Sequence, residues 1–238
     1  MKTFTSTTHF SPSTKTIITI GSFDGVHIGH KKILQKVVAE AKKNNLTSAV
    51  LTFFPHPRFI LNQNSDLKLL NTIEEKKALL NSTGLDALLI HPFDQEFANL
   101  SPEQFVKKIL VDQLKISKII IGYDHRFGKN RAADINDLIQ FGTKYNFEVE
   151  QISAQELNEI AISSTKIRTA LSNGDISLAN SYLGYPYSFS GKVIKGKQIG
   201  RTIGFPTANI EIQEPLKLLP KNGVYIVKCL VKNQEVNG

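Results

Sequence analysis

Apolar positions along the first three quarters of the chain follow two different spacings. β-Branched and other apolar residues gather in short runs at residues 16–20, 49–54, 85–90, 118–121 and 147–152, and such runs predict buried strands. Elsewhere apolar residues recur every three or four positions, as on the buried face of a helix. This second pattern predicts helices at residues 31–43, 72–81, 101–110, 137–145, 164–171 and 176–183.

Strands that alternate with helices predict an α/β fold with a mostly parallel sheet covered on both faces. In such sheets ligands bind beyond the carboxyl ends of the strands, at the turns that lead into helices. Three of these turns, at residues 21–30, 55–58 and 122–131, combine glycines with histidines or arginines, or bring histidine and arginine together, so the candidate chemistry is concentrated there. We therefore expect the functional site there.

The pattern changes after the second of the two adjacent helices near residue 183. From Tyr187 onward glycines and β-branched residues dominate without a helical period, which predicts short antiparallel strands. A domain boundary is expected near residues 184–187. It divides the chain into a first domain, residues 1–185, and a second, residues 186–238.

Composition narrows the class of protein. Hydrophobic residues make up 41% of the chain and charged residues 21%, values typical of a globular protein and not of a disordered one. The single cysteine, Cys229, excludes a disulfide framework and a four-cysteine zinc site. No apolar run approaches the ~20 residues that span a bilayer, and residues 1–15 lack the apolar core of a secretion signal. We expect a cytoplasmic protein.

The charge balance implies an anionic partner. The chain has 29 Lys and Arg against 21 Asp and Glu, a formal net charge of +8. Nucleic acid, an anionic membrane surface and small phosphorylated molecules all fit this excess, and many lysine-rich proteins bind no nucleic acid. The positions of the basic residues therefore matter more than their number.

The turn after the first predicted strand carries Gly-Ser-Phe-Asp-Gly-Val-His-Ile-Gly-His over residues 21–30. Its two histidines, His27 and His30, lie at the start of a predicted helix, where backbone N–H groups and the helix dipole attract anions. Each imidazole can donate a hydrogen bond to a phosphoryl oxygen. Surface histidines or a metal pair are the alternatives, although a metal would need a third ligand.

A second cationic helix start follows at residues 162–168, Ile-Ser-Ser-Thr-Lys-Ile-Arg. Its hydroxyl groups can accept or donate at the helix N-terminus, Lys166 adds positive charge, and Arg168 offers a two-pronged donor for phosphate. Taken alone, residues 163–165 could also be an ordinary helix cap.

These two segments resemble the paired signature of nucleotidyltransferases. Phe-Pro-His-Pro-Arg at 54–58 and Gly-Tyr-Asp-His-Arg-Phe-Gly-Lys at 122–129 resemble the flavin side of bacterial FAD synthetases, and residues 191–201 and 204–209 look like the opening of a riboflavin kinase domain. Nearly the whole chain is thus similar to the bifunctional riboflavin kinase/FAD synthetase family. The resemblance implies a Rossmann-like nucleotidyltransferase domain followed by part of an antiparallel β-barrel.

Some positions depart from the family pattern. His125 stands where the family usually has an aromatic residue such as Phe, and Ala132-Ala133 where a glycine is frequent. The chain also ends at Gly238, before the segment where a family member would place its kinase glutamate. On this basis we expect no riboflavin phosphorylation by this chain.

The resemblance implies transfer of AMP from ATP to FMN, with Mg²⁺ bound to the nucleotide, and no nucleic-acid or membrane partner. A transferase with another phosphate acceptor and a non-catalytic flavin- or nucleotide-binding paralogue are the alternatives. Asp24 could be only a turn residue, Phe127 a core residue, and Arg58 and Arg131 solvated surface. The implied residues are His27, His30 and Arg168 for catalysis; Gly21, Phe23, Asp24, Gly29, Ser164, Thr165 and Lys166 for ATP; Pro55, His56, Arg58, Asp124, Phe127 and Arg131 for FMN; and Thr207 and Asn209 for the Mg-ATP of a kinase.

Overall fold

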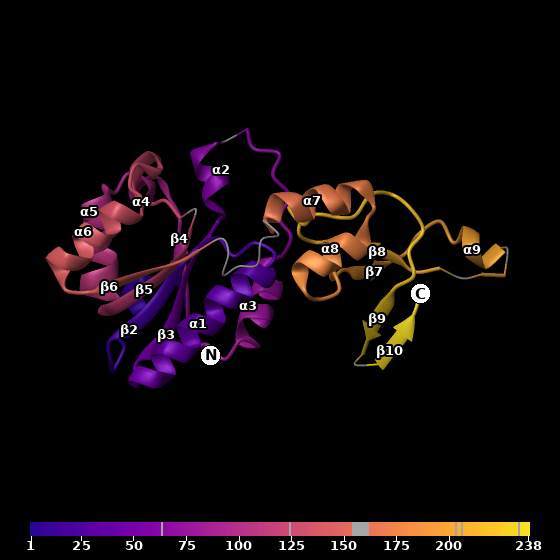
Figure 1. Ribbon diagram of the computed structural model, residues 1–238. Helices are drawn as coiled ribbons and strands as arrows, with labels where there is room; N and C mark the ends of the chain where they lie inside the picture. Colours follow the sequence, from indigo (N-terminus) through magenta and orange to yellow (C-terminus); the bar gives the residue numbers. More distant parts are fainter. Residues whose placement is uncertain (63, 124, 154–161, 203, 206, 233) are drawn as a thin grey trace.

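The structure is a computed structural model that describes residues 1–62, 64–123, 125–153, 162–202, 204–205, 207–232 and 234–238. Its larger part is built on a parallel six-stranded sheet of order β1-β4-β3-β2-β5-β6 (Figure 1). The expected α/β fold is therefore confirmed. The strands are β1 (Lys2–Phe4), β2 (Thr16–Ile20), β3 (Thr47–Phe54), β4 (Ala87–Pro92), β5 (Ile116–Gly122) and β6 (Glu148–Ile152).

The strand order reverses at the middle of the sheet. From β2 the chain continues to β3 and β4 on one side, and β5 then pairs with the opposite edge of β2, with Ile18 beside Ile119. At such a reversal the two following turns diverge and leave a crevice at the carboxyl ends of the strands. The turn that leaves β2 begins at Gly21, and the turn that leaves β5 follows Gly122.

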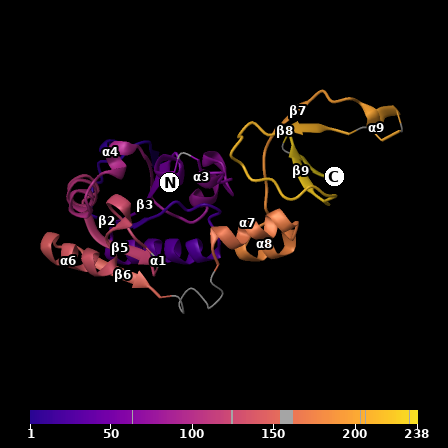
Figure 2. The same ribbon diagram turned by 90° about the horizontal axis from the view of Figure 1, so that it is seen from above.

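Helices cover both faces of the sheet (Figure 2). Successive strand residues alternate between two apolar cores: Ile17 and Val50 pack with α1 and α3, whereas Ile18 and Leu51 pack with the α5–η2 helix and α6. The helices of this part are α1 (Ile28–Asn44), α2 (Pro57–Leu61), α3 (Ile73–Asn81), α4 (Gln95–Ala98), α5 (Pro102–Gln104), which continues as the π-helix η2 (Phe105–Gln113), and α6 (Ile135–Tyr145).

Sequence signals at helix starts agree with the structure. Thr72 and Glu75 form the expected capping box of α3, and Ser101 caps α5 with Pro102 at its first position. One strand was not predicted. β1 has only three residues, too few to show an alternating pattern in the sequence. It forms as a strand by pairing with β4 at the edge of the sheet.

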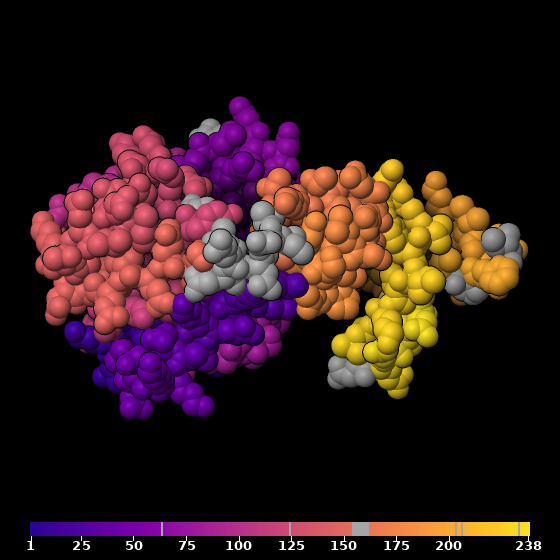
Figure 3. All heavy atoms as spheres, in the orientation of Figure 1, coloured from indigo at the N-terminus to yellow at the C-terminus, as the bar shows by residue number. Residues whose placement is uncertain are grey.

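A helical pair, α7 (Ser164–Asn173) and α8 (Ile176–Leu183), forms a third apolar cluster around Leu70. Beyond it the chain extends to one side as antiparallel pairs, as expected from its composition (Figures 1 and 3). The pairs are β7 (Lys192–Ile194) with β8 (Asn209–Glu211) and β9 (Lys228–Val231) with β10 (Gln234–Asn237), and a short helix, α9 (Ile199–Thr202), lies between β7 and β8.

Candidate active site at two helix N-termini

The turn after β2 places two imidazole rings together at the start of α1. His27 caps the helix, and its Nδ1 accepts a hydrogen bond from the backbone N–H of His30 at 3.3 Å. The two rings stack with centroids 3.6 Å apart and planes 16° from parallel. A Cβ added at Gly29 would lie 3.3 Å from the His27 ring, so a glycine leaves room for this stacking. The predicted histidine pair is therefore present as a pair.

His30 is neutral at physiological pH. Burial is the main cause that holds its pKa well below the usual 6.5, and the nearby His27 and Lys76 act in the same direction. A neutral imidazole has one N–H donor and one acceptor nitrogen. Nδ1 of His30 is buried and has no hydrogen-bond partner within the described structure. The ring thus has hydrogen-bonding capacity left for a ligand.

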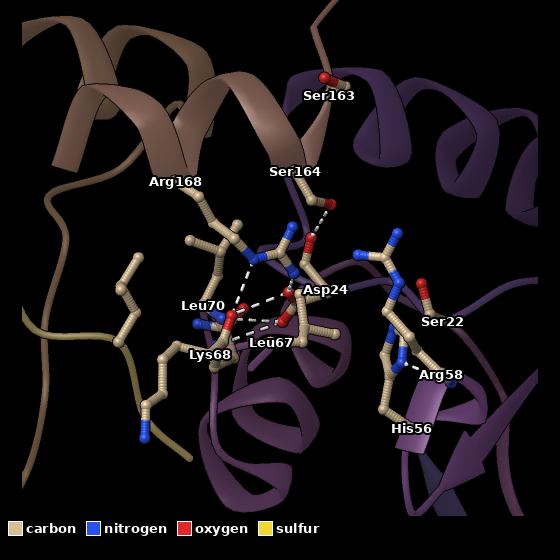
Figure 4. A network of polar contacts seen from close by, with 12 residues as sticks. Ser22, Asp24, His56, Arg58, Leu67, Lys68, Leu70, Ser163, Ser164 and Arg168 are labelled. Atoms are coloured by element: carbon tan, nitrogen blue, oxygen red, sulfur yellow. Dashed lines mark hydrogen bonds and ion pairs between the residues drawn. The ribbon is translucent and has the colours of Figure 1, made fainter. Parts of the chain in front are cut away.

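Asp24 links the turn that leads into α1 with the start of α7. Its carboxylate, 1% exposed, accepts hydrogen bonds from the N–H groups of Leu70 at 3.0 Å and Asn71 at 3.3 Å, and it forms an ion pair with Arg168 of α7. Its backbone carbonyl accepts a hydrogen bond from Ser164 Oγ at 2.8 Å (Figure 4). The buried Asp24 carboxylate therefore links residues 70–71 with Arg168 of α7.

The start of α7 presents a mixed set of groups. Ser163 is the helix cap, with its Oγ accepting from Lys166 N–H at 3.3 Å, so the ordinary capping role applies to this residue. Arg168 Nε donates to the carbonyl of Lys68 at 2.7 Å, which fixes the guanidinium between Asp24 and that carbonyl. Thr165 and Lys166 have exposed side chains in the first turn.

The turn after β3 adds a further histidine beside this network (Figure 4). The Phe54–Pro55 peptide bond is cis, and His56 caps α2 by accepting from Arg58 N–H at 3.2 Å. Burial, together with the nearby cations Lys76, Arg168 and Arg58, lowers the pKa of His56 to about 4. His56 is therefore also uncharged at neutral pH, in a strongly cationic surrounding.

This shift predicts a pH-dependent stability. Because the folded-state pKa of His56 lies below its unfolded value of 6.5, the unfolded chain binds more protons between pH 6.5 and about 4, and stability falls as the pH falls through that range. The slope for one such group reaches about 1.4 kcal/mol per pH unit. His56→Asn keeps a capping oxygen but cannot titrate. We expect wild type to lose more free energy of unfolding than His56→Asn between pH 7 and 4.5 in urea titrations; parallel pH dependences would contradict this.

Arg58 and Arg168 face a common cleft. Its volume is about 540 Å³, and Lys68 adds a third cation to its wall. The other lining residues are Asn62, Asn64, Ser65, Asp66, Leu67, Ser172 and Leu218. A polar cleft with three cations next to the Asp24 network suits an anionic ligand.

The FMN candidates that follow β5 do not lie together beside the Asp24 network. Phe127 is 7% exposed and belongs to the core on the η2 side, with its ring centroid 5.9 Å from that of Phe105. His125 stacks against it at 6.2 Å. Phe127 is therefore a core residue, which was one of the two alternatives that the sequence left open. Arg131 is exposed on a 3-10 turn, η3 (Lys129–Arg131), and Asp124 lies outside the described residues.

Other candidates have backbone or packing roles in the structure. Gly21 N–H donates to Leu51 O at 3.1 Å, and Phe23 is 2% exposed with its ring edge against His30 at 5.0 Å. The two kinase candidates lie apart from this network: Asn209 begins β8 with its side chain against Gly196, and Thr207 is exposed nearby.

Sequence reasoning missed Lys76. This lysine of α3 is 7% exposed, and its Nζ donates to the carbonyl of Ser22 at 2.7 Å, which holds the turn before Asp24. Burial lowers its pKa, and Asp24 opposes that shift. A signal was available, because Lys76 shares one helix face with the apolar Ile73 and Leu80.

The described residues contain no group of three or more His, Cys, Asp or Glu side chains that could hold a metal ion. The Asp24 carboxylate is already occupied by Leu70, Asn71 and Arg168.

Comparison with known families gives two adjacent matches. A family model described as FAD synthetase matches residues 10–166, and one described as riboflavin kinase matches residues 183–238. The second match gives no support to the expectation that this chain lacks riboflavin kinase activity.

Three similar proteins share the name bifunctional riboflavin kinase/FMN adenylyltransferase. The one from Buchnera aphidicola subsp. Schizaphis graminum is 44% identical over 212 residues, which cover 89% of this chain and 67% of that protein. The Listeria monocytogenes protein is 39% identical, with 92% and 69% covered, and the Escherichia coli K12 protein is 37% identical, with 92% and 70% covered.

A similar solved structure is the crystal structure of a protein from Streptococcus pneumoniae described as a macrolide-efflux protein. It is 27% identical, and the alignment covers 99% of this chain and 76% of that one with a TM-score of 0.88. Among the residues described for the present chain, none of the helices is long and apolar enough to cross a membrane.

Proposed function

Because the chain belongs to the family of bifunctional riboflavin kinase/FMN adenylyltransferases, we propose that it transfers AMP from ATP to FMN and releases pyrophosphate. The observation that carries this proposal is the joining of two helix N-termini: Asp24, in the turn that leads into α1, contacts Ser164 and Arg168 of α7. A triphosphate carries negative charge along its whole length, so two helix N-termini can bind it from two sides.

The reaction asks for little covalent work from the protein. A phosphate oxygen of FMN attacks the α-phosphorus of ATP, the bond from that phosphorus to the bridging oxygen breaks, and pyrophosphate leaves with the electron pair. The nucleophile is already an anion, so no base is required. Catalysis then consists of positioning and of stabilising charge on the phosphoryl oxygens.

The start of α1 would hold the α- and β-phosphates. Neutral His30 would donate one N–H to the phosphates, with His27 stacked beside it. Backbone N–H groups in the first turn of α1 would add further donors. A neutral donor stabilises developing charge without binding the ground-state triphosphate as strongly as a cation would. Gly21 and Phe23 remain the candidates that would border the nucleotide, and Gly29 leaves the space that the His27 ring occupies.

The start of α7 would hold the departing pyrophosphate. Lys166 and Thr165 are exposed there and can turn toward a ligand, and Ser164 orients the helix through Asp24. Arg168 has five N–H donors, of which contacts to Asp24 and Lys68 use only some. We assign Asp24 the role of placing Arg168.

For FMN, we propose Pro55, His56 and Arg58 as the contacts nearest to the Asp24 network, with Arg131 and Asp124 as further candidates. The flavin phosphate would lie in the cleft lined by Arg58 and Arg168. The domain division between residues 185 and 186 is also a proposal, and the riboflavin kinase match begins close to it, at residue 183.

A direct assay tests the proposal. The chain is incubated with MgATP and either FMN or riboflavin, and flavin fluorescence is followed together with chromatography of the products. We expect fluorescence to fall with FMN as FAD forms, because adenine then stacks on the flavin ring. A reaction without ATP is the control. Absence of FAD from FMN would contradict the proposal, and phosphorylation of riboflavin would overturn the expectation of an inactive kinase.

A further inference from the structure

A segment of the second region packs against the first beside the candidate site. Residues 216–218 pair with Leu69 as an added strand would: Leu69 N–H donates to Leu216 O at 2.7 Å, and Leu218 N–H donates to Leu69 O at 2.8 Å. The segment falls within the match to riboflavin kinase, whereas Leu69 falls within the match to FAD synthetase. The two regions are therefore linked through backbone hydrogen bonds.

Lys217 occupies the middle of this segment and is 4% exposed. Its Nζ donates to the carbonyl of Leu70 at 2.7 Å and to Glu75 Oε2 at 2.6 Å, and it lies 4.5 Å from the centre of the Tyr187 ring. A buried ammonium is costly unless it is paired and hydrogen-bonded, and here it is both. The Lys217 ammonium therefore restrains the two groups that it binds, the Leu70 carbonyl and the Glu75 carboxylate.

The peptide groups of Leu70 connect Lys217 with the active-site network. The Leu70 N–H donates to the Asp24 carboxylate, and the Leu70 carbonyl accepts from Lys217. Asp24 in turn forms the ion pair that holds Arg168. Two residues, Leu70 and Asp24, therefore lie between Lys217 of the second region and the guanidinium proposed to bind phosphate.

A second connection passes through α3. Glu75 Oε2, which accepts from Lys217, also accepts from the backbone N–H of Thr72 at the start of that helix. One residue further along α3, Lys76 holds the carbonyl of Ser22 in the turn before Asp24. Both connections end on the same turn.

We propose that Lys217 is a positioning residue of the adenylyltransferase site, through which the riboflavin kinase-like region holds Leu70, Asp24 and Arg168 in place. This inference rests on the proposed function for its effect on turnover. Its structural part, the hold on Leu70, can be measured without any turnover. Lys217 itself lies behind Leu70 and is not proposed to touch substrate.

The test compares Lys217→Met with Lys228→Met in the full chain. Methionine keeps the apolar stem of Lys217 and removes the ammonium, while Lys228 is an exposed lysine of the same region, paired only at the surface with Glu235. We expect Lys217→Met to lower kcat for FAD formation about 10- to 100-fold, with KM for ATP changed less than threefold. Lys217→Arg should restore most of the turnover, and Lys228→Met should match wild type.

Hydrogen exchange provides the readout that does not depend on activity. We expect the amides of Leu70 and Asn71, which donate to Asp24, to exchange at least tenfold faster in Lys217→Met than in wild type or Lys228→Met. Lys217→Gln replaces Lys217→Met if that variant does not fold.

The outcomes separate the two proposals. Faster exchange with reduced kcat supports the inference, whereas wild-type exchange and wild-type kcat in a folded Lys217 variant overturn it. If wild type forms no FAD, the proposed function fails, and exchange at Leu70 and Asn71 alone decides whether Lys217 holds the site.

Discussion

Replacing His30 with alanine is expected to lower kcat for FAD formation about 100- to 1,000-fold, the usual effect of removing one donor to a developing charge. The neutral ring lies at the start of α1, and its Nδ1 has no partner within the described structure. Loss of the ring therefore removes few internal hydrogen bonds. We expect the free energy of unfolding to change much less than the activation free energy.

The measurement is kcat at saturating ATP and FMN, with urea unfolding carried out on the same preparations. His9→Ala is the matched control, because His9 is exposed on the 3-10 turn η1 (Thr7–His9) and belongs to neither helix of the candidate site. It should leave both quantities near those of wild type. Turnover within threefold of wild type for His30→Ala would remove His30 from the mechanism.

Replacing Asp24 with alanine is expected to have the largest effect on stability, about 3–5 kcal/mol. The substitution leaves the guanidinium of Arg168 without its counter-charge and leaves two backbone N–H groups, those of Leu70 and Asn71, without acceptors. It also removes the negative charge that offsets the buried ammonium of Lys76. Each of these groups is costly to bury alone.

Urea unfolding at pH 7 measures this effect. Asp112→Ala is the matched control, since Asp112 is half-exposed and pairs with Lys107 at the surface, where such a change costs less than about 1 kcal/mol. An Asp24→Ala protein less than 1 kcal/mol below wild type would show that the Asp24 network does not hold the two helix starts together.

Local signals in the sequence predict most of this fold. Runs of β-branched and other apolar residues mark β2 through β6, and capping residues such as Thr72 and Ser101 mark helix starts to within a residue. The histidine pair was predictable for the same reason, because residues three apart at a helix start lie close together. Such features depend on neighbours in the sequence, and these are visible in a single chain.

Long-range contacts could not be predicted in this way. Asp24 is 46 residues from Leu70 and 144 from Arg168, and no local pattern indicates that its carboxylate turns inward. Lys217 is 142 residues from Glu75. A lysine is among the residues least often buried, so both Lys76 and Lys217 would ordinarily be assigned to the surface.

Phe127 illustrates a different limit. An aromatic residue in a glycine-containing turn fits a ligand contact as well as a core position, and only the pairing of Phe127 with Ala133 turns its ring toward Phe105. The pairing follows from the course of the loop, which the residue types do not determine.

The position of the basic residues in space was equally out of reach. The net charge of +8 indicated an anionic ligand but not where it binds, because the three cations that line the cleft, Arg58, Lys68 and Arg168, come from separate parts of the chain.

The strand order at the middle of the sheet also has a kinetic consequence. Ile18 pairs with Ile119, so β2 finds one of its two partners only after about 100 residues of chain have been made and closed into a loop. Closing such a loop costs about 1 kcal/mol more than closing one of 30 residues, the separation between β2 and β3. During synthesis β2 can pair with β3 before β5 has been made. Refolding of this domain should accordingly be slower than that of a protein with local contacts.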